Sequence, residues 1–157
     1  MQYSIFTIVK ELGEKMSWVC PNCGREFRAT NQFHSCEQST IELHIDGKPE
    51  FIVEIFHTIL NLVTSFGEVE LLPLKTSIQV RAKSAFLAIY LKQNKVHLEF
   101  QLGHESNIKQ ITKTIRISKR RVFHHADLFS VDDIDNKLVS ELKEAYNTIT
   151  KSEYNYK

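Results

Sequence analysis

Three cysteines and one histidine stand close together near the start of this chain, in the segment from Cys20 to Cys36. Cys20 and Cys23 form a C-x2-C pair, and His34 and Cys36 follow after ten further residues. Three thiolates and one imidazole complete the closed tetrahedron that holds structural zinc in proteins. The pattern therefore predicts one structural Zn²⁺ site, with Cys20, Cys23, His34 and Cys36 as its four ligands.

Other interpretations of this cluster remain open at the level of sequence. The three thiols could be free and the histidine unrelated, and the ligand set alone does not exclude iron. A redox C-x-x-C pair normally belongs to a βαβ setting, which this sequence lacks. The chain has only these three cysteines, an odd number confined to one segment. That usage favours a metal site in a reducing compartment over a secreted disulfide scaffold.

The remaining composition suits a folded protein that does not enter membranes. Hydrophobic residues make up 42% of the chain, which is enough for a core, and the net charge is only +1. No apolar run approaches the roughly 20 residues that span a bilayer. The first residues have no basic region, and Glu11 and Glu14 stand where a signal peptide would have its cleavage region. We expect a cytoplasmic protein, and the oligomeric state is left open.

The segmentation predicted from residue patterns has four parts. Residues 1–16 are a short helical segment, and residues 17–38 are a loop-built zinc knuckle rich in Cys, Pro, Gly, Asn and Ser. Residues 39–150 form the main domain, and residues 151–157 are a frayed polar tail. The Asp46-Gly47 turn precedes Pro49, a residue favoured in a first helical turn.

Within residues 39–150 the apolar periods predict two helices and a set of strands. Helical spacing recurs from residue 49 to 66, where Gly67 is the natural stop, and again after Ser130, whose pairing with Asp133 resembles a capping box. Alternation or continuous apolar character predicts strands at 76–82, 85–91, 96–102, 111–117 and 121–126. Short connections favour antiparallel neighbours. We therefore expect an α+β fold, with a four- to five-stranded antiparallel meander and both helices on one face.

The knuckle segment also resembles a known family. The run W-x-C-P-x-C-G-x-x-F…N-Q-x-H-S-C, from Trp18 to Cys36, resembles the opening of a bacterial and archaeal domain family of unknown function. The resemblance continues through a long helix, Pro73-Leu74-Lys75-Thr76, a strand with Phe86, a histidine near His125, and Glu144-Ala145-Tyr146. It covers most of residues 18–147. It implies the same layout of elements and brings no activity with it.

If both helices cover the apolar face of the sheet, the other face collects polar side chains. Arg81 and Arg116 could hold a phosphate or carboxylate by bidentate hydrogen bonds, with Lys75 as an added point charge. Residues 113–121 carry five positive charges and no acid. The plain alternatives are a solvated sheet face and an edge strand that its charges protect from aggregation. The predicted ligand-binding residues are Lys75, Arg81, His97, Glu99, Arg116, Arg120, Arg121 and His125.

Three kinds of function fit these residues. The leading hypothesis is a non-enzymatic binding module that recognises an anionic partner, either a nucleic acid or a nucleotide-like small molecule. The second is a small hydrolase or nuclease that uses His124 or His125 with Glu99, although no P-loop, G-x-S-x-G or dinucleotide fingerprint is present. The third is a protein-interaction adaptor acting through the same face. Adjacent strand residues point to opposite faces, so His124 and His125 cannot easily share one ligand. No catalytic residue is assigned.

Overall fold

The computed structural model describes residues 17–34, 36 and 39–151. The chain divides into two compact units, Met1–Gln38 and Ser39–Lys157, which we call the knuckle unit and the sheet unit. The helical segment expected at residues 1–16 lies outside the described residues, as does the tail beyond Lys151. Within the described part, no helix has both the length and the apolar character needed to cross a membrane.

The described part of the knuckle unit is built on a small hairpin. Strand β1 (Trp18–Val19) pairs antiparallel with β2 (Glu26–Phe27), so that Trp18 lies opposite Phe27. The turn between them is closed by two backbone hydrogen bonds, from Gly24 N to Cys20 O and from Cys20 N to Arg25 O. Gly24 has a φ of 70°, which is the left-handed conformation that glycine adopts without strain.

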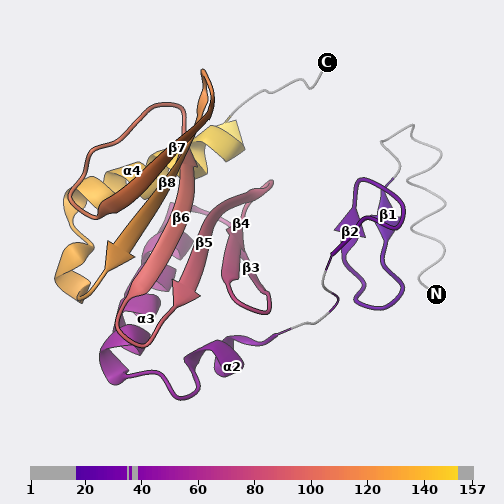
Figure 1. Ribbon diagram of the computed structural model, residues 1–157, viewed down its shortest axis with the longest axis horizontal. Helices are drawn as coiled ribbons and strands as arrows, with labels where there is room; N and C mark the ends of the chain where they lie inside the picture. The colour runs from indigo at the N-terminus through magenta and orange to yellow at the C-terminus, as the bar shows by residue number, and fades with distance from the viewer. Residues whose placement is uncertain (1–16, 35, 37–38, 152–157) are drawn as a thin grey trace. The chain divides into compact units, whose positions relative to one another are not determined.

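The sheet unit contains six antiparallel strands (Figure 1). They are β3 (Glu70–Pro73), β4 (Ile78–Arg81), β5 (Ala85–Leu91), β6 (Val96–Leu102), β7 (Ile111–Ser118) and β8 (Arg121–Leu128), in the spatial order β3-β4-β5-β6-β8-β7. The predicted α+β class is confirmed, but the sheet has more strands than expected and is not a simple meander. β8 lies between β6 and β7, and the four-residue β3 was not predicted.

The burial of the strands explains this order. β8 buries every second residue, whereas all of β7 after Ile111 is exposed. An exposed, charged strand belongs at a sheet edge, and a strand with one buried face belongs inside the sheet. β3 occupies the other edge and ends at Pro73, a residue that is tolerated on edge strands because it cannot donate to the ladder.

Both long helices cover the same face of the sheet (Figure 1). Helix α3 (Glu50–Phe66) buries Ile52, Ile55, Phe56, Ile59 and Val63, and α4 (Asn136–Lys151) buries Leu138, Leu142 and Ala145. A short helix α2 (Ile41–Ile45), which was not predicted, precedes them. The last helix begins later than expected, because residues Val131–Asp133 form a separate 3-10 turn. The Asp133 carboxylate accepts hydrogen bonds from the backbone N–H groups of Phe129 and Ser130 there.

The pleat of β6 shows how the sheet divides its two faces. Val96, Leu98, Phe100 and Leu102 are fully or almost fully buried under the helices. The alternate residues His97, Glu99 and Gln101 are half-buried on the other side, which we call the open face. This face positions the polar side chains described below.

Candidate metal centre and polar sheet face

The four predicted zinc ligands of the knuckle unit converge. Cys20 and Cys23 come from the turn of the hairpin, and His34 and Cys36 come from the loop that follows β2. The Sγ atoms of Cys20 and Cys36 lie 3.6 Å apart. His34 Nε2 lies 3.4 Å from Cys23 Sγ and 3.2 Å from Cys36 Sγ. All four ligand atoms lie within 4.8 Å of one another.

These separations match a tetrahedral metal site. With Zn–S near 2.3 Å and Zn–N near 2.0–2.1 Å, a tetrahedron puts two sulfurs about 3.8 Å apart, and a sulfur and a nitrogen about 3.6 Å apart. The distances in the knuckle unit fall within a few tenths of an ångström of those values. The cluster is therefore compatible with a metal ion held by all four residues.

The surroundings of His34 orient its ring toward the sulfurs. Its Nδ1 donates a hydrogen bond to the carbonyl oxygen of Gln32 at 2.6 Å, so Nε2 is left to face Cys23 and Cys36. Metal-bound histidines usually have such a partner on the second nitrogen. The ring also packs against Phe27, with centroids 4.1 Å apart, and lies edge-on to Trp18 at 5.9 Å.

Hydrogen bonding also favours the thiolate form of Cys23. Burial acts to raise the pKa of this thiol, but hydrogen bonds from the backbone and side chain of Arg25, together with Cys20 and His34, outweigh it and lower the pKa to about 6. The hydrogen bond to the Gln32 carbonyl, with help from the cysteines, raises the pKa of His34 above its usual value. Thiolates are the form in which cysteine binds metal ions.

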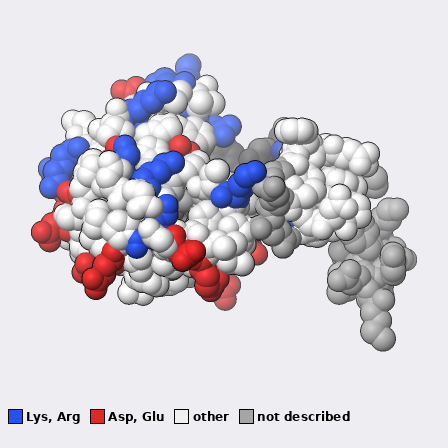
Figure 2. Space-filling view, turned by 60° about the horizontal axis from the view of Figure 1, so that its bottom comes forward, with Lys and Arg blue, Asp and Glu red and all other residues white. Residues whose placement is uncertain are grey.

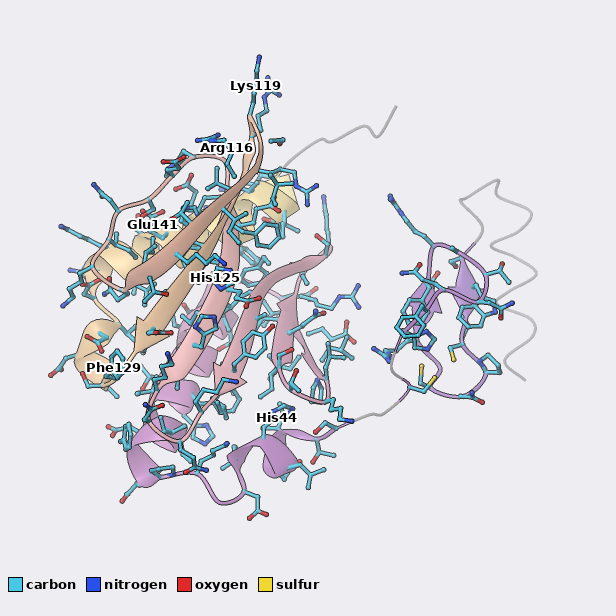
Figure 3. All side chains as sticks on the ribbon, in the orientation of Figure 1. His44, Arg116, Lys119, His125, Phe129 and Glu141 are labelled. Atoms are coloured by element: carbon cyan, nitrogen blue, oxygen red, sulfur yellow. The ribbon has the colours of Figure 1, made fainter. Side chains whose placement is uncertain are left out.

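A second group of side chains lies on the open face of the sheet unit, at the centre of the sheet (Figure 3). His97 and Glu99 come from β6, and His125 comes from the neighbouring position of β8, directly opposite Glu99. His97 Nε2 lies 3.2 Å from His125 Nδ1 and 3.5 Å from Glu99 Oε1. His125 Nδ1 lies 3.3 Å from the same Glu99 oxygen. We call these three residues the open-face triad.

Neighbouring groups hold the triad in place. Asp127 Oδ1 accepts a hydrogen bond from His97 Nδ1 at 2.6 Å, and Asp127 Oδ2 accepts one from Lys95 Nζ at 2.9 Å. Burial acts to raise the pKa of Asp127, but these two partners outweigh it and lower that pKa. The Tyr90 hydroxyl donates to Glu99 Oε2 at 3.2 Å. Burial and the Glu99 carboxylate together raise the pKa of Tyr90.

The two adjacent histidines lie on opposite faces of the sheet. His125 belongs to the open face, whereas His124 is fully buried on the helix side and stacks on Phe100, with ring centroids 5.5 Å apart. Its Nε2 accepts a hydrogen bond from the Ser106 backbone N–H at 3.0 Å. Burial lowers the pKa of His124, and the ring serves as a neutral core residue.

The predicted cationic residues do not join the open-face triad. Arg81 lies at the end of β4, where it lines a cavity of about 580 Å³ with Glu68, Lys83 and Tyr146. Lys75 lies in the connection between β3 and β4, and Arg120 lies in the turn between β7 and β8. Arg121 begins β8, and its Nε donates to Gln101 Oε1 at 3.2 Å.

The expectation that Arg81 and Arg116 hold one anion together is wrong. A bulge between Ile111 and Lys113 reverses the alternation of β7, so Arg116 pairs with the buried Val122 and points to the helix side. Three strands separate β4 from β7 in the sheet order, which places the two strands about 19 Å apart at the usual spacing of 4.7–4.9 Å. Arg116 instead pairs with Glu105, at 3.1 Å.

Comparison with known proteins places the sheet unit in a family. Residues 41–149 match the family described as a domain of unknown function (DUF5655), so this chain belongs to that family. The matched range begins after the knuckle, so the Cys/His cluster lies outside it. No curated protein and no solved structure matches the chain.

Proposed function

We propose that the protein is a binding module for an anionic partner, with a structural Zn²⁺ ion in the knuckle unit and a nucleic acid as the partner of the sheet unit. The observation that carries the second part is the hairpin of β7 and β8, which projects from one end of the sheet with Lys119 at its tip (Figure 3). Its cationic residues are Lys113, Arg116, Lys119, Arg120 and Arg121.

The exposure and pairing of the hairpin support this proposal. All five cationic residues are exposed, and Arg116 is the only one in an ion pair with an acidic side chain among the described residues. In the space-filling view, Lys and Arg side chains lie at the top of the sheet unit and over its middle, and most acidic side chains lie along its lower margin (Figure 2). Phosphate backbones bind such cationic surfaces by releasing condensed counterions.

Apolar residues on the same strand favour a binding surface over a merely protected edge. Charged residues alone are sufficient to keep an edge strand from pairing with another chain. Yet Ile115 and Ile117 stand on either side of Arg116 in β7 and are 36% and 54% exposed. Apolar side chains such as isoleucine can contact bases and insert between base steps, beside cations that bind the phosphates.

The experiment compares two charge-matched double variants in fluorescence anisotropy with mixed-sequence DNA and RNA oligonucleotides over a range of salt concentrations. Lys119→Ala/Arg120→Ala removes two hairpin cations, and Lys137→Ala/Lys143→Ala removes two exposed cations from α4. For duplex DNA, the slope of log K against log salt should fall by up to about 1.8 in the hairpin variant.

The α4 variant should bind like the wild type. Absence of binding to every oligonucleotide at low salt, or equal losses in the two variants, would refute the nucleic acid proposal. A nucleotide-like small molecule would then be the remaining anionic ligand to test.

A further inference from the structure

Beyond this function, we propose that the open-face triad, His97, Glu99 and His125, is a second metal site that binds a divalent transition-metal ion. Each of the three residues offers one ligand atom to a common point, and these atoms all lie within 4.8 Å of one another. The proposal is independent of both the zinc knuckle and the nucleic acid surface.

The triangle formed by the three ligand atoms has the size that a metal ion requires. Its sides are 3.2 Å, 3.3 Å and 3.5 Å. The circle through these atoms has a radius of about 1.9 Å, slightly less than a typical Zn–N or Zn–O bond of about 2.0–2.2 Å. An ion seated just above the plane of the triangle can therefore bind all three atoms without any change in the backbone.

A hydrogen bond to Asp127 fixes His97 in the tautomer that metal binding requires. The Asp127 carboxylate can only accept, so the 2.6 Å contact requires His97 Nδ1 to carry the proton. The lone pair of neutral His97 is then on Nε2, which points at Glu99 and His125. A carboxylate behind a histidine is the usual support of a metal ligand, because it orients the ring and raises its basicity.

The two carboxylate oxygens of Glu99 have different partners. Its Oε1 faces both histidines, while its Oε2 accepts the hydrogen bond from Tyr90. The carboxylate is thus held so that one oxygen is directed to the proposed ion. Lys95 supports Asp127 from the other side, which gives the site an outer layer of partners drawn from β5, β8 and the β5–β6 turn.

The donor set indicates the class of ion. Two imidazoles and one carboxylate suit Zn²⁺, Fe²⁺, Co²⁺, Ni²⁺ or Mn²⁺, whereas Ca²⁺ and Mg²⁺ prefer sites made of oxygen atoms. Three protein ligands leave coordination positions open. The ligand side chains are 20% to 29% exposed, so these positions are accessible to water or to an oxygen of an anionic ligand. The Cys3His cluster has four protein ligands and leaves no such position.

A shared proton is the alternative explanation of the short distances. Without an ion, His125 Nδ1–H would donate to His97 Nε2 or Glu99 Oε1, and the triad would be a hydrogen-bond network. A further group, His104 with Glu141 and Glu144, also has the spacing of metal ligands, but His104 and Glu144 are already paired at 2.8 Å and about half exposed. The group of His104, Glu141 and Glu144 therefore provides the matched control.

The experiment measures metal content on the full chain. The protein is stripped with a chelator, dialysed against Co²⁺ or Zn²⁺, and analysed by elemental mass spectrometry, and the thiolate-to-Co²⁺ absorption is recorded on the same samples. His97→Ala and His125→Ala should each hold one ion fewer than the wild type with an unchanged thiolate band. His104→Ala should hold as many ions as the wild type. Asp127→Asn, which keeps all three ligands, should weaken the second ion about 10- to 100-fold.

Folding is checked by thermal unfolding of each variant without metal, and added Zn²⁺ should raise the melting temperature of the wild type more than that of the two histidine variants. The proposal is overturned if His97→Ala and His125→Ala hold the same number of ions as the wild type, or if His104→Ala is the variant that loses one. The thiolate band reports metal binding by the knuckle separately. The result for the open-face triad can therefore be interpreted even if the knuckle binds no metal.

Discussion

The two units of this chain are organised by different forces. In the described part of the knuckle unit, the only buried hydrophobic residues are Cys20 and Cys23, which are themselves candidate ligands. In the sheet unit, a continuous core joins α3, α4 and four central strands, with Ile52, Phe56 and Leu98 among its fully buried members. Because the described residues of the knuckle unit form no such core, we expect this part of the chain to need a metal or another cross-link to stay folded, whereas the sheet unit can rely on the hydrophobic effect.

The comparison predicts that metal removal unfolds one unit alone. Zn²⁺ binding to small finger peptides contributes on the order of 10–16 kcal/mol at neutral pH. Cys23→Ser, or treatment of the wild type with a strong chelator, should therefore unfold residues 17–36 and leave the sheet unit folded. Amide hydrogen exchange by mass spectrometry would report each unit separately, with loss of protection confined to peptides from the knuckle.

Two controls sharpen that result. Thr30→Ala changes an exposed residue of the same unit that is not one of the four candidate ligands, and it should retain the metal and the protection pattern. The division between the units is wrong if chelation also removes protection from the two helices α3 and α4, or if Cys23→Ser leaves the knuckle peptides protected.

The reverse perturbation is made in the core of the sheet unit. Phe56 is fully buried on α3, and Phe56→Ala should cost about 3–5 kcal/mol through lost burial and the cavity left behind. Denaturant unfolding monitored by far-UV circular dichroism would measure the cost. The metal content and thiolate absorption of the knuckle should not change. Phe51→Ala, at an exposed position of the same helix, should cost much less.

The sequence predicted the knuckle cluster more completely than the open-face triad, for a physical reason. The four knuckle ligands lie within one short segment, so their spacing carries the geometry. The triad comes from two strands that pair at long range, and sequence alone does not fix their register. His97, Glu99 and His125 were each identified as polar residues of one face, but their convergence on one point depends on the pairing of Glu99 with His125.

Other parts of the open face were missed because the strands were predicted too short or with the wrong alternation. Asp127 stands two residues after His125 and so shares its face, but the predicted strand stopped at residue 126. Tyr90 lay in a segment that is apolar throughout, and its role depends on Glu99 from the next strand. The bulge in β7, which moved Arg116 to the other face, leaves no local signal in the sequence.

Two glycines, one in each unit, allow a finer test of the same comparison. Gly24 in the knuckle has a φ of 70° and nothing within 4 Å of an added Cβ. The only free-energy cost of Gly24→Ala is therefore that of holding alanine in the left-handed backbone conformation. Gly67, which ends α3, has a φ of 152° and a ψ of −158°, a region that is almost restricted to glycine. An added Cβ there would also overlap the hydroxyl of Tyr146.

Gly24→Ala should therefore cost about 1–2 kcal/mol, measured as a roughly 5- to 30-fold weaker Zn²⁺ affinity in competition with a chelator, with the unfolding of the sheet unit unchanged. Gly67→Ala should cost about 2–3 kcal/mol in denaturant unfolding and leave the Zn²⁺ affinity alone. Adding Tyr146→Phe to Gly67→Ala removes the hydroxyl, so the double variant should lose less than the sum of the two single costs. Additive costs would mean that Tyr146 moves aside freely and that the backbone conformation alone requires glycine at this position.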